Sequence, residues 1–118
     1  MTNAASGVVL VVEDEALLLF AIADELRDVG FNVLEARNAD EAVARLEAHP
    51  DIAVVFTDVD MPGSMDGLGL MALVDQRWPA MKVVVTSGKK LPDRHAMPAA
   101  VQFLSKPYVI DQVVRAIG

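Results

Sequence analysis

The chain has 118 residues, 53% of them hydrophobic, which suits one ordinary domain: we expect a loose tail at 1–6, a single domain over 7–118 and no room for a second. Its formal charge of −7 disfavours direct nucleic-acid binding, because phosphate contacts require concentrated Lys and Arg. Cysteine is absent, which excludes disulfides and thiolate metal sites, and the first apolar run is too short to span a membrane, so we expect a soluble cytoplasmic protein.

Short apolar runs alternate with segments of helical period in the first half of the chain. The run Val8–Val12 is typical of a strand buried on both faces. The helix predicted over 14–29 ends at Gly30, and four apolar side chains mark its inner face: Leu18, Ile22, Leu26 and Val29. A second strand is predicted over 31–36. Asn38 or Asp40 can cap the next helix, which runs to about residue 49 with an inner face of Ala42, Val43 and Leu46.

The alternation continues in the second half. The predicted elements are a third and most apolar strand over 52–57, a Gly- and Pro-containing loop over 58–67, a helix over 68–77, strands over 81–86 and 101–104, and a last helix over 108–117. Four side chains should form the buried stripe of the last helix: Val109, Val113, Val114 and Ile117. Residues 87–100 contain two prolines and little apolar periodicity, so the fourth of five helices is expected to be short, displaced or irregular.

This order of elements predicts an α/β fold. Strands separated by single helices require right-handed crossovers and a mainly parallel sheet covered on both faces, which is the doubly wound architecture. In such a sheet, ligands bind where loops leave the carboxyl ends of the strands. The residues at those ends are therefore the candidate functional residues.

Charged and hydroxyl side chains stand at four of the five strand ends. They are Glu13 and Asp14 after the first strand, Asp58 after the third, Thr86 at the end of the fourth and Lys106 after the fifth, with Asp60 as a further carboxylate if it turns inward. Carboxylates without His or Cys form a site for a hard cation, and Mg²⁺ is the first candidate. Mg²⁺ takes one or two carboxylates and keeps positions for phosphate oxygens, which fits Asp14 and Asp58.

The remaining groups at this edge suit a phosphoryl group. Lys106 can place a positive charge on one phosphoryl oxygen, and Thr86 can donate a hydrogen bond to another. With these charges neutralised, Asp58 can attack the phosphorus of a donor in line and form an aspartyl phosphate.

Together these motifs resemble the receiver domain of two-component response regulators, of the single-domain chemotaxis-regulator kind, over nearly the whole chain. The residues that carry the resemblance are Glu13-Asp14, Asp58 followed by Met61-Pro62 and Met65-Asp66-Gly67, Thr86-Ser87, and Lys106-Pro107. The resemblance implies a flavodoxin-like sheet of five strands in the order 2-1-3-4-5 and a cis peptide bond before Pro107. It also implies that Asp58 accepts a phosphoryl group from a histidine kinase in a phosphorelay. In that family Lys106 would contact the phosphoryl group, and Mg²⁺ would be held by Glu13, Asp14, Asp58 and the backbone carbonyl of Asp60.

The resemblance further implies a switch rather than an enzyme, beyond the domain's own phosphorylation and dephosphorylation. The Thr86 hydroxyl would move toward the phosphoryl group and Phe103 would turn inward, which changes the face formed by the fourth predicted helix, the fifth strand and the last helix. Output would then pass to a downstream protein or a phosphotransfer protein, or through a homodimer formed by that face, without nucleic-acid or membrane contact.

Two features depart from the family pattern, and two alternatives stay open. The loop between Met61-Pro62 and Asp66-Gly67 is one residue longer than usual, and a carboxylate at position 60 leads to the hypothesis that Asp60 influences the lifetime of the phosphoryl group.

The run Phe56–Asp60 also has the DxD pattern of haloacid-dehalogenase-like phosphatases, so a small phosphatase is one alternative. The other is a binding module that is never phosphorylated.

Overall fold

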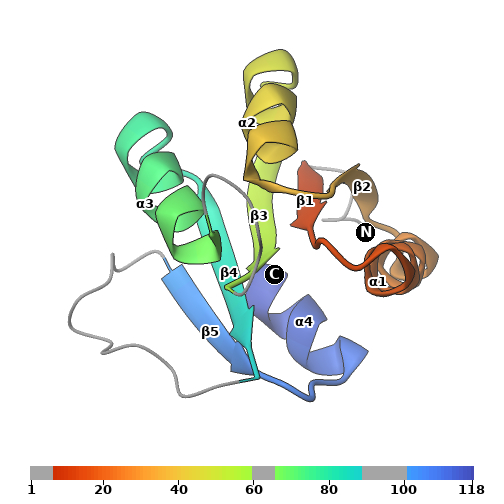
Figure 1. Cartoon of the computed structure of the whole chain (residues 1–118). Helices are drawn as coiled ribbons and strands as arrows, with labels where there is room; N and C mark the ends of the chain where they lie inside the picture. The colour runs from red at the N-terminus through yellow and green to blue at the C-terminus, as the bar shows by residue number, and fades with distance from the viewer. Residues whose placement is uncertain (1–6, 60–65, 89–100) are drawn as a thin grey trace.

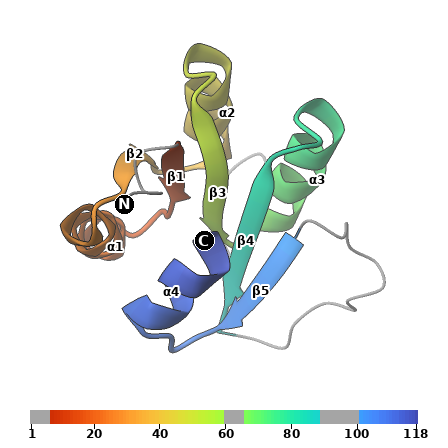
Figure 2. The same ribbon diagram turned by 180° about the vertical axis from the view of Figure 1, so that it is seen from behind.

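The computed structural model describes residues 7–59, 66–88 and 101–118, and its strands form one parallel sheet in the order β2-β1-β3-β4-β5 (Figures 1 and 2). The strands are β1 Val8–Val12, β2 Asn32–Ala36, β3 Ile52–Asp58, β4 Lys82–Ser87 and β5 Val101–Ser105. The described helices are α1 Ala16–Val29, α2 Ala39–Ala48, α3 Gly67–Arg77 and α4 Ile110–Ile117. The predicted doubly wound α/β class, the strand order and the cis bond between Lys106 and Pro107 are confirmed.

Two apolar layers cover the two faces of the sheet. Side chains of a strand point alternately to opposite faces, so neighbouring residues of one strand enter different layers. Leu10 and Val55 pack with α2 and α3 on one face, whereas Val11 and Phe56 pack with α1 and α4 on the other. This two-sided burial explains why β1, β3 and β4 read as continuous aliphatic runs rather than as alternating patterns.

The inner face of α1 differs in part from the predicted one, since Leu26 is buried as predicted and Ile22 packs against the same layer. Leu18 and Val29 are 42% and 51% exposed, and the buried stripe consists of Leu19, Ala23 and Leu26. Residues 16–22 are all apolar, so their spacing does not single out one face. The predicted end of the helix is confirmed, because Gly30 adopts a left-handed φ of 114° and closes the last turn.

The start of α2 decides between the two predicted cap residues, and the start of α4 corrects the predicted buried stripe. Asn38 caps α2, since its side chain accepts a hydrogen bond from the Glu41 N–H at 2.8 Å. Val109 was wrongly assigned to the buried stripe of the last helix: it precedes α4 as the cap residue and is 62% exposed. Residues 1–6 and 89–100 lie outside the described residues, and with them the expected tail and nearly all of the fourth predicted helix.

The start of α3 lies directly against the end of β3. The Gly67 N–H donates a hydrogen bond to the Val59 carbonyl at 3.0 Å, and a Cβ on Gly67 would lie 2.0 Å from the Asp58 carbonyl oxygen. Only glycine permits this approach. The Asp66 side chain caps the same helix by accepting from the Gly69 N–H at 2.8 Å, so the start of α3 is held against the end of β3. None of the described helices is long and apolar enough to cross a membrane.

Candidate functional site

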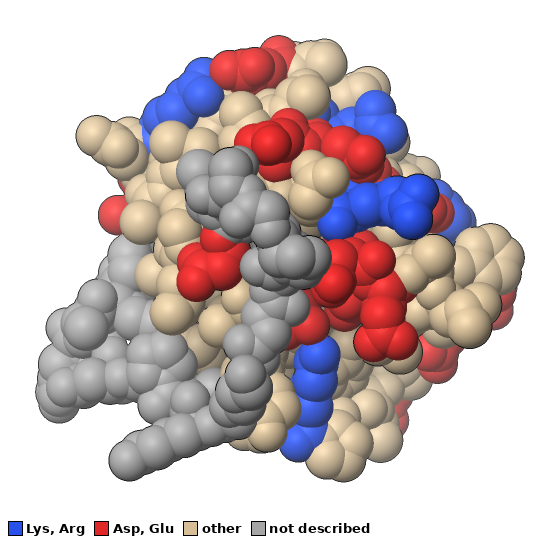
Figure 3. Space-filling view, in the orientation of Figure 1, with Lys and Arg blue, Asp and Glu red and all other residues tan. Residues whose placement is uncertain are grey.

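Neighbouring strands bring the predicted polar residues to one edge of the sheet. β1 and β3 are paired with Val12 opposite Thr57, so the residues that follow β1 lie beside Asp58. β3 and β4 are paired with Asp58 opposite Thr86. Acidic side chains gather in the middle of the face shown in Figure 3. The carboxyl end of the sheet is therefore a polar edge above an apolar interior.

Three carboxylates form the acidic part of the site. One oxygen each of Glu13, Asp14 and Asp58 lies within 4.8 Å of the other two. Asp58 and Glu13 are only 5% and 8% exposed, so their charges are held out of bulk water. An all-oxygen donor set without nitrogen or sulfur fits Mg²⁺. Asp60 lies outside the described residues, and the contact of its carbonyl with the metal stays a prediction.

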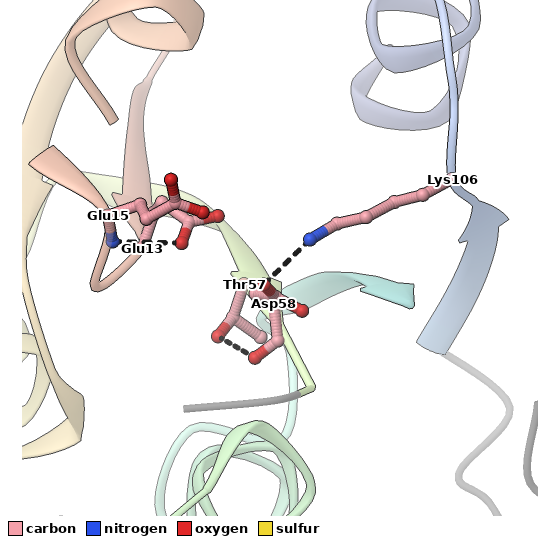
Figure 4. Close-up of polar contacts among 5 residues, drawn as sticks. All are labelled: Glu13, Glu15, Thr57, Asp58 and Lys106. Atoms are coloured by element: carbon pink, nitrogen blue, oxygen red, sulfur yellow. Dashed lines mark hydrogen bonds and ion pairs between the residues drawn. The ribbon is translucent and has the colours of Figure 1, made fainter. Parts of the chain in front are cut away.

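Lys106 supplies the positive charge on the opposite side of Asp58 from Glu13 (Figure 4). Its Nζ contacts Asp58 Oδ2 at 2.8 Å, and the Lys106 N–H donates to the Ser87 carbonyl at 2.9 Å. The aliphatic stem passes Gly88, where a Cβ would lie 3.8 Å from the lysine Cδ. One oxygen of the candidate nucleophile is thus paired with an ammonium group, and the carboxyl also faces the other two acids.

Burial of the acidic cluster shifts the pKa of Glu13. Burial raises the pKa of Glu13 to about 7, against the hydrogen bond that its Oε2 accepts from the Glu15 N–H at 3.1 Å. A hydrogen bond with Asp14 and the negative charge of Asp58 raise this pKa further. A bound cation would favour the charged form, because it offsets the repulsion among the three carboxylates.

Thr86 and Phe103 lie where the sequence placed them. Thr86 is 1% exposed and lies opposite Asp58 in the strand register, and its carbonyl accepts from the Val59 N–H at 2.9 Å. Phe103 on β5 is half-buried against the layer shared with α2 and α3. Their roles in switching concern a movement, and these roles stay predictions.

Tyr108 lies two positions after Lys106, and no role for it was predicted from the sequence. Its ring contacts Phe56 edge to face, with ring centroids 5.9 Å apart. Burial raises the pKa of Tyr108 to about 12, and the negative charges of Glu13 and Asp58 add to this shift, so the phenol lies in the field of the acidic cluster. An aromatic residue directly after Lys106-Pro107 was the only signal available in the sequence.

The family model of the response regulator receiver domain matches residues 9–118. The putative response regulator NtrX-like protein of Rickettsia conorii is 34% identical over 110 residues, which are 90% of this chain and 23% of that protein. The chain therefore spans less than a quarter of the length of this relative.

Two solved structures share the fold. A response regulator receiver domain protein from Clostridium thermocellum is 28% identical with a TM-score of 0.86, covering 94% of this chain and 90% of the other. The response regulator TrrA of Thermotoga maritima, solved in complex with Mg(2+)-BeF, is 21% identical with a TM-score of 0.79, covering 94% and 96%. The family match agrees with the resemblance found in the sequence and favours it over the haloacid-dehalogenase alternative.

Proposed function

The chain belongs to the response regulator receiver domain family, and we propose that it accepts a phosphoryl group on Asp58 from a histidine kinase in a Mg²⁺-dependent reaction. The observation that supports the proposal is the position of Asp58 between a lysine and two further carboxylates. One of its oxygens meets Lys106 at 2.8 Å, while the carboxyl group shares a cluster with Glu13 and Asp14. We further propose that the receiver domain occupies residues 7–118, slightly more than the 9–118 matched by the family model.

The residues around Asp58 can each take part in the transfer. Glu13, Asp14 and Asp58 would hold Mg²⁺, which when bound supplies positive charge to the phosphoryl oxygens. The Asp58 carboxylate attacks the phosphorus, and the bond from phosphorus to the donor breaks on the far side. Lys106 then pairs with a phosphoryl oxygen instead of the carboxylate, and Thr86 donates its hydroxyl to another. The ligand pair in the Thermotoga maritima structure, Mg(2+)-BeF, is the kind of ligand that we propose for this site.

The partners in this proposal are proteins. α1 begins just after the acidic pair and exposes Leu17 and Phe20, by 83% and 64%, so the first turns of this helix would offer an apolar contact area to the donor protein. Output would follow from a change of the face that includes β5 and α4, driven by Thr86 and Phe103 as the family resemblance implies. A homodimer through that face is one form that the output can take.

The test is phosphorylation by a small-molecule donor. Wild-type protein incubated with acetyl phosphate and Mg²⁺ should gain the mass of one phosphoryl group per chain, and chelation of the metal should prevent this gain. Asp58→Asn should remove the labelling, whereas the matched change Asp51→Asn, at an exposed aspartate before β3, should not.

Two other outcomes would count against the proposal. Absence of labelling in the wild type with Mg²⁺ would favour a binding module that is never phosphorylated. Continued release of phosphate from a general phosphatase substrate over many turnovers would favour a phosphatase.

A further inference from the structure

An aromatic contact joins the two segments that carry the Lys106–Asp58 ion pair. Phe56 stands two positions before Asp58 on β3, and Tyr108 stands two positions after Lys106. Their rings meet edge to face at 5.9 Å with an interplanar angle of 80°, a favoured geometry for aromatic pairs. The contact therefore spans the same gap as the ion pair, on the side of the sheet that faces α1 and α4.

Tyr108 is the apolar anchor of the connection between β5 and α4. Ser105, Pro107 and Val109 are exposed, whereas Tyr108 is half-buried and packs in the layer that contains Phe56 and Val113. At the start of the connection, the Lys106 N–H donates a hydrogen bond to the Ser87 carbonyl on β4. The backbone of Lys106 is thus held at two points, one polar on β4 and one aromatic on β3.

The position of this backbone matters because the lysine side chain is long. Its four-carbon stem has many rotamers, and the ammonium group reaches Asp58 only from a suitable Cα position. Misplacing a catalytic group by about 1 Å can cost as much as 100-fold in rate. Loosening the connection at Tyr108 should therefore affect Lys106 more than the acidic cluster, whose residues lie at the ends of the paired strands β1 and β3.

We propose that Tyr108 is a positioning residue that sets the Lys106 ammonium against Asp58 by packing its ring on Phe56. The inference rests on the proposed phosphorylation of Asp58 and adds a residue that acts through Lys106 rather than on the phosphoryl group. The ring makes the contact and the hydroxyl does not, so Phe at position 108 should replace Tyr and an aliphatic residue should not.

The first test compares labelling rates with acetyl phosphate at varied Mg²⁺ concentration. Tyr108→Leu should lower the maximal rate by about tenfold, because the ammonium is no longer held, while the Mg²⁺ concentration for half-maximal rate stays within about twofold of the wild-type value. Tyr108→Phe should keep the wild-type rate, and Phe56→Leu should reproduce the loss from the other side of the contact. Val114→Ala, in the same layer on α4, is the control for packing loss alone and should leave the rate unchanged.

A second test does not depend on phosphorylation. The NMR resonance of the Lys106 Cε should move toward that of a free surface lysine in Tyr108→Leu and Phe56→Leu, and should stay in place in Tyr108→Phe and Val114→Ala. If wild-type protein is labelled and both ring-removing variants keep its rate and its Lys106 resonance, the positioning role is wrong and the proposed function stands. If wild-type protein is never labelled, the proposed function fails, and the Lys106 resonance alone decides the positioning role.

Discussion

The two ends of the sheet hold very different groups although the same strands run between them. At the carboxyl end, Glu13, Asp58 and Thr86 are polar and nearly fully buried. At the amino end, hollows with volumes of about 230 and 420 Å³ are lined mainly by apolar residues, among them Phe31, Ile117, Trp78 and Met81. Buried like charges oppose folding, whereas apolar linings do not. The contrast indicates that the carboxyl end is arranged for chemistry and the amino end for packing.

The largest expected effect on stability comes from replacing a glycine by alanine, and one glycine at each end of the sheet allows the comparison. Gly67→Ala would place a Cβ 2.0 Å from the Asp58 carbonyl oxygen, and this backbone has no room to move, so we expect a loss of about 3 kcal/mol or more in the free energy of unfolding. Gly7→Ala meets one atom closely, the Cβ of Ala53 at 2.6 Å, and clears the nearest backbone atom by 3.7 Å, so the smaller overlap should cost about 1 kcal/mol. Urea denaturation measures both values. Equal losses would contradict the idea that the backbone beneath Asp58 is the more constrained of the two ends.

A smaller effect concerns pH in the absence of Mg²⁺. The pKa of Glu13 is raised from 4.5 to about 7 in the fold, mainly by burial, so the folded protein binds this proton more tightly than the unfolded chain does. Stability from this group is complete below pH 4.5 and is lost as pH rises to about 7. The loss should be roughly 1 to 2 kcal/mol, since nearby solvent reduces the cost of burying the charged carboxylate.

Glu13→Gln removes this titration and serves as the matched variant. Its free energy of unfolding should vary less with pH than that of the wild type between about pH 4.5 and 7. Denaturant titrations at several pH values in a chelating buffer give the comparison. If the free energy of unfolding varied with pH in the same way for both proteins, ionisation of Glu13 would not be the cause of the lost stability.

The smallest expected effect is at the amino end. Arg77 forms an ion pair with Glu47 at 2.9 Å and lies over the Trp78 ring at 4.5 Å, and both charged side chains are more than 40% exposed. Arg77→Ala should therefore cost less than about 1 kcal/mol and leave labelling by acetyl phosphate unchanged. Trp78 is the only tryptophan, so its fluorescence should report the lost guanidinium but not the addition of Mg²⁺ to the wild type. A changed labelling rate would mean that the two ends are coupled.

The strands, and the residues at their carboxyl ends, could be predicted from the sequence. Asp58 and Lys106 could be placed together because parallel strands end at one edge, and the aliphatic runs identified the strands. Leu26 was correctly assigned to the buried face of α1, but the buried face of the first two turns could not be predicted, since these turns are apolar on every side and only packing chooses Leu19 over Leu18. The contact of Phe56 with Tyr108 was missed for a related reason: it joins distant segments, and no local pattern marks it.

The most direct test of the central claim is to map the binding of Mg²⁺ and beryllofluoride, a phosphoryl mimic, by amide chemical shifts in NMR. If the carboxyl end of the sheet is the phosphoryl site, the largest shifts should occur at Glu13, Asp58, Thr86 and Lys106, they should require both ligands, and they should be absent from Asp58→Asn. Residues at the amino end, such as Gly7 and Trp78, should keep their shifts. Shifts concentrated at the amino end, or a full response in Asp58→Asn, would contradict the assignment of Asp58 as the phosphorylated residue.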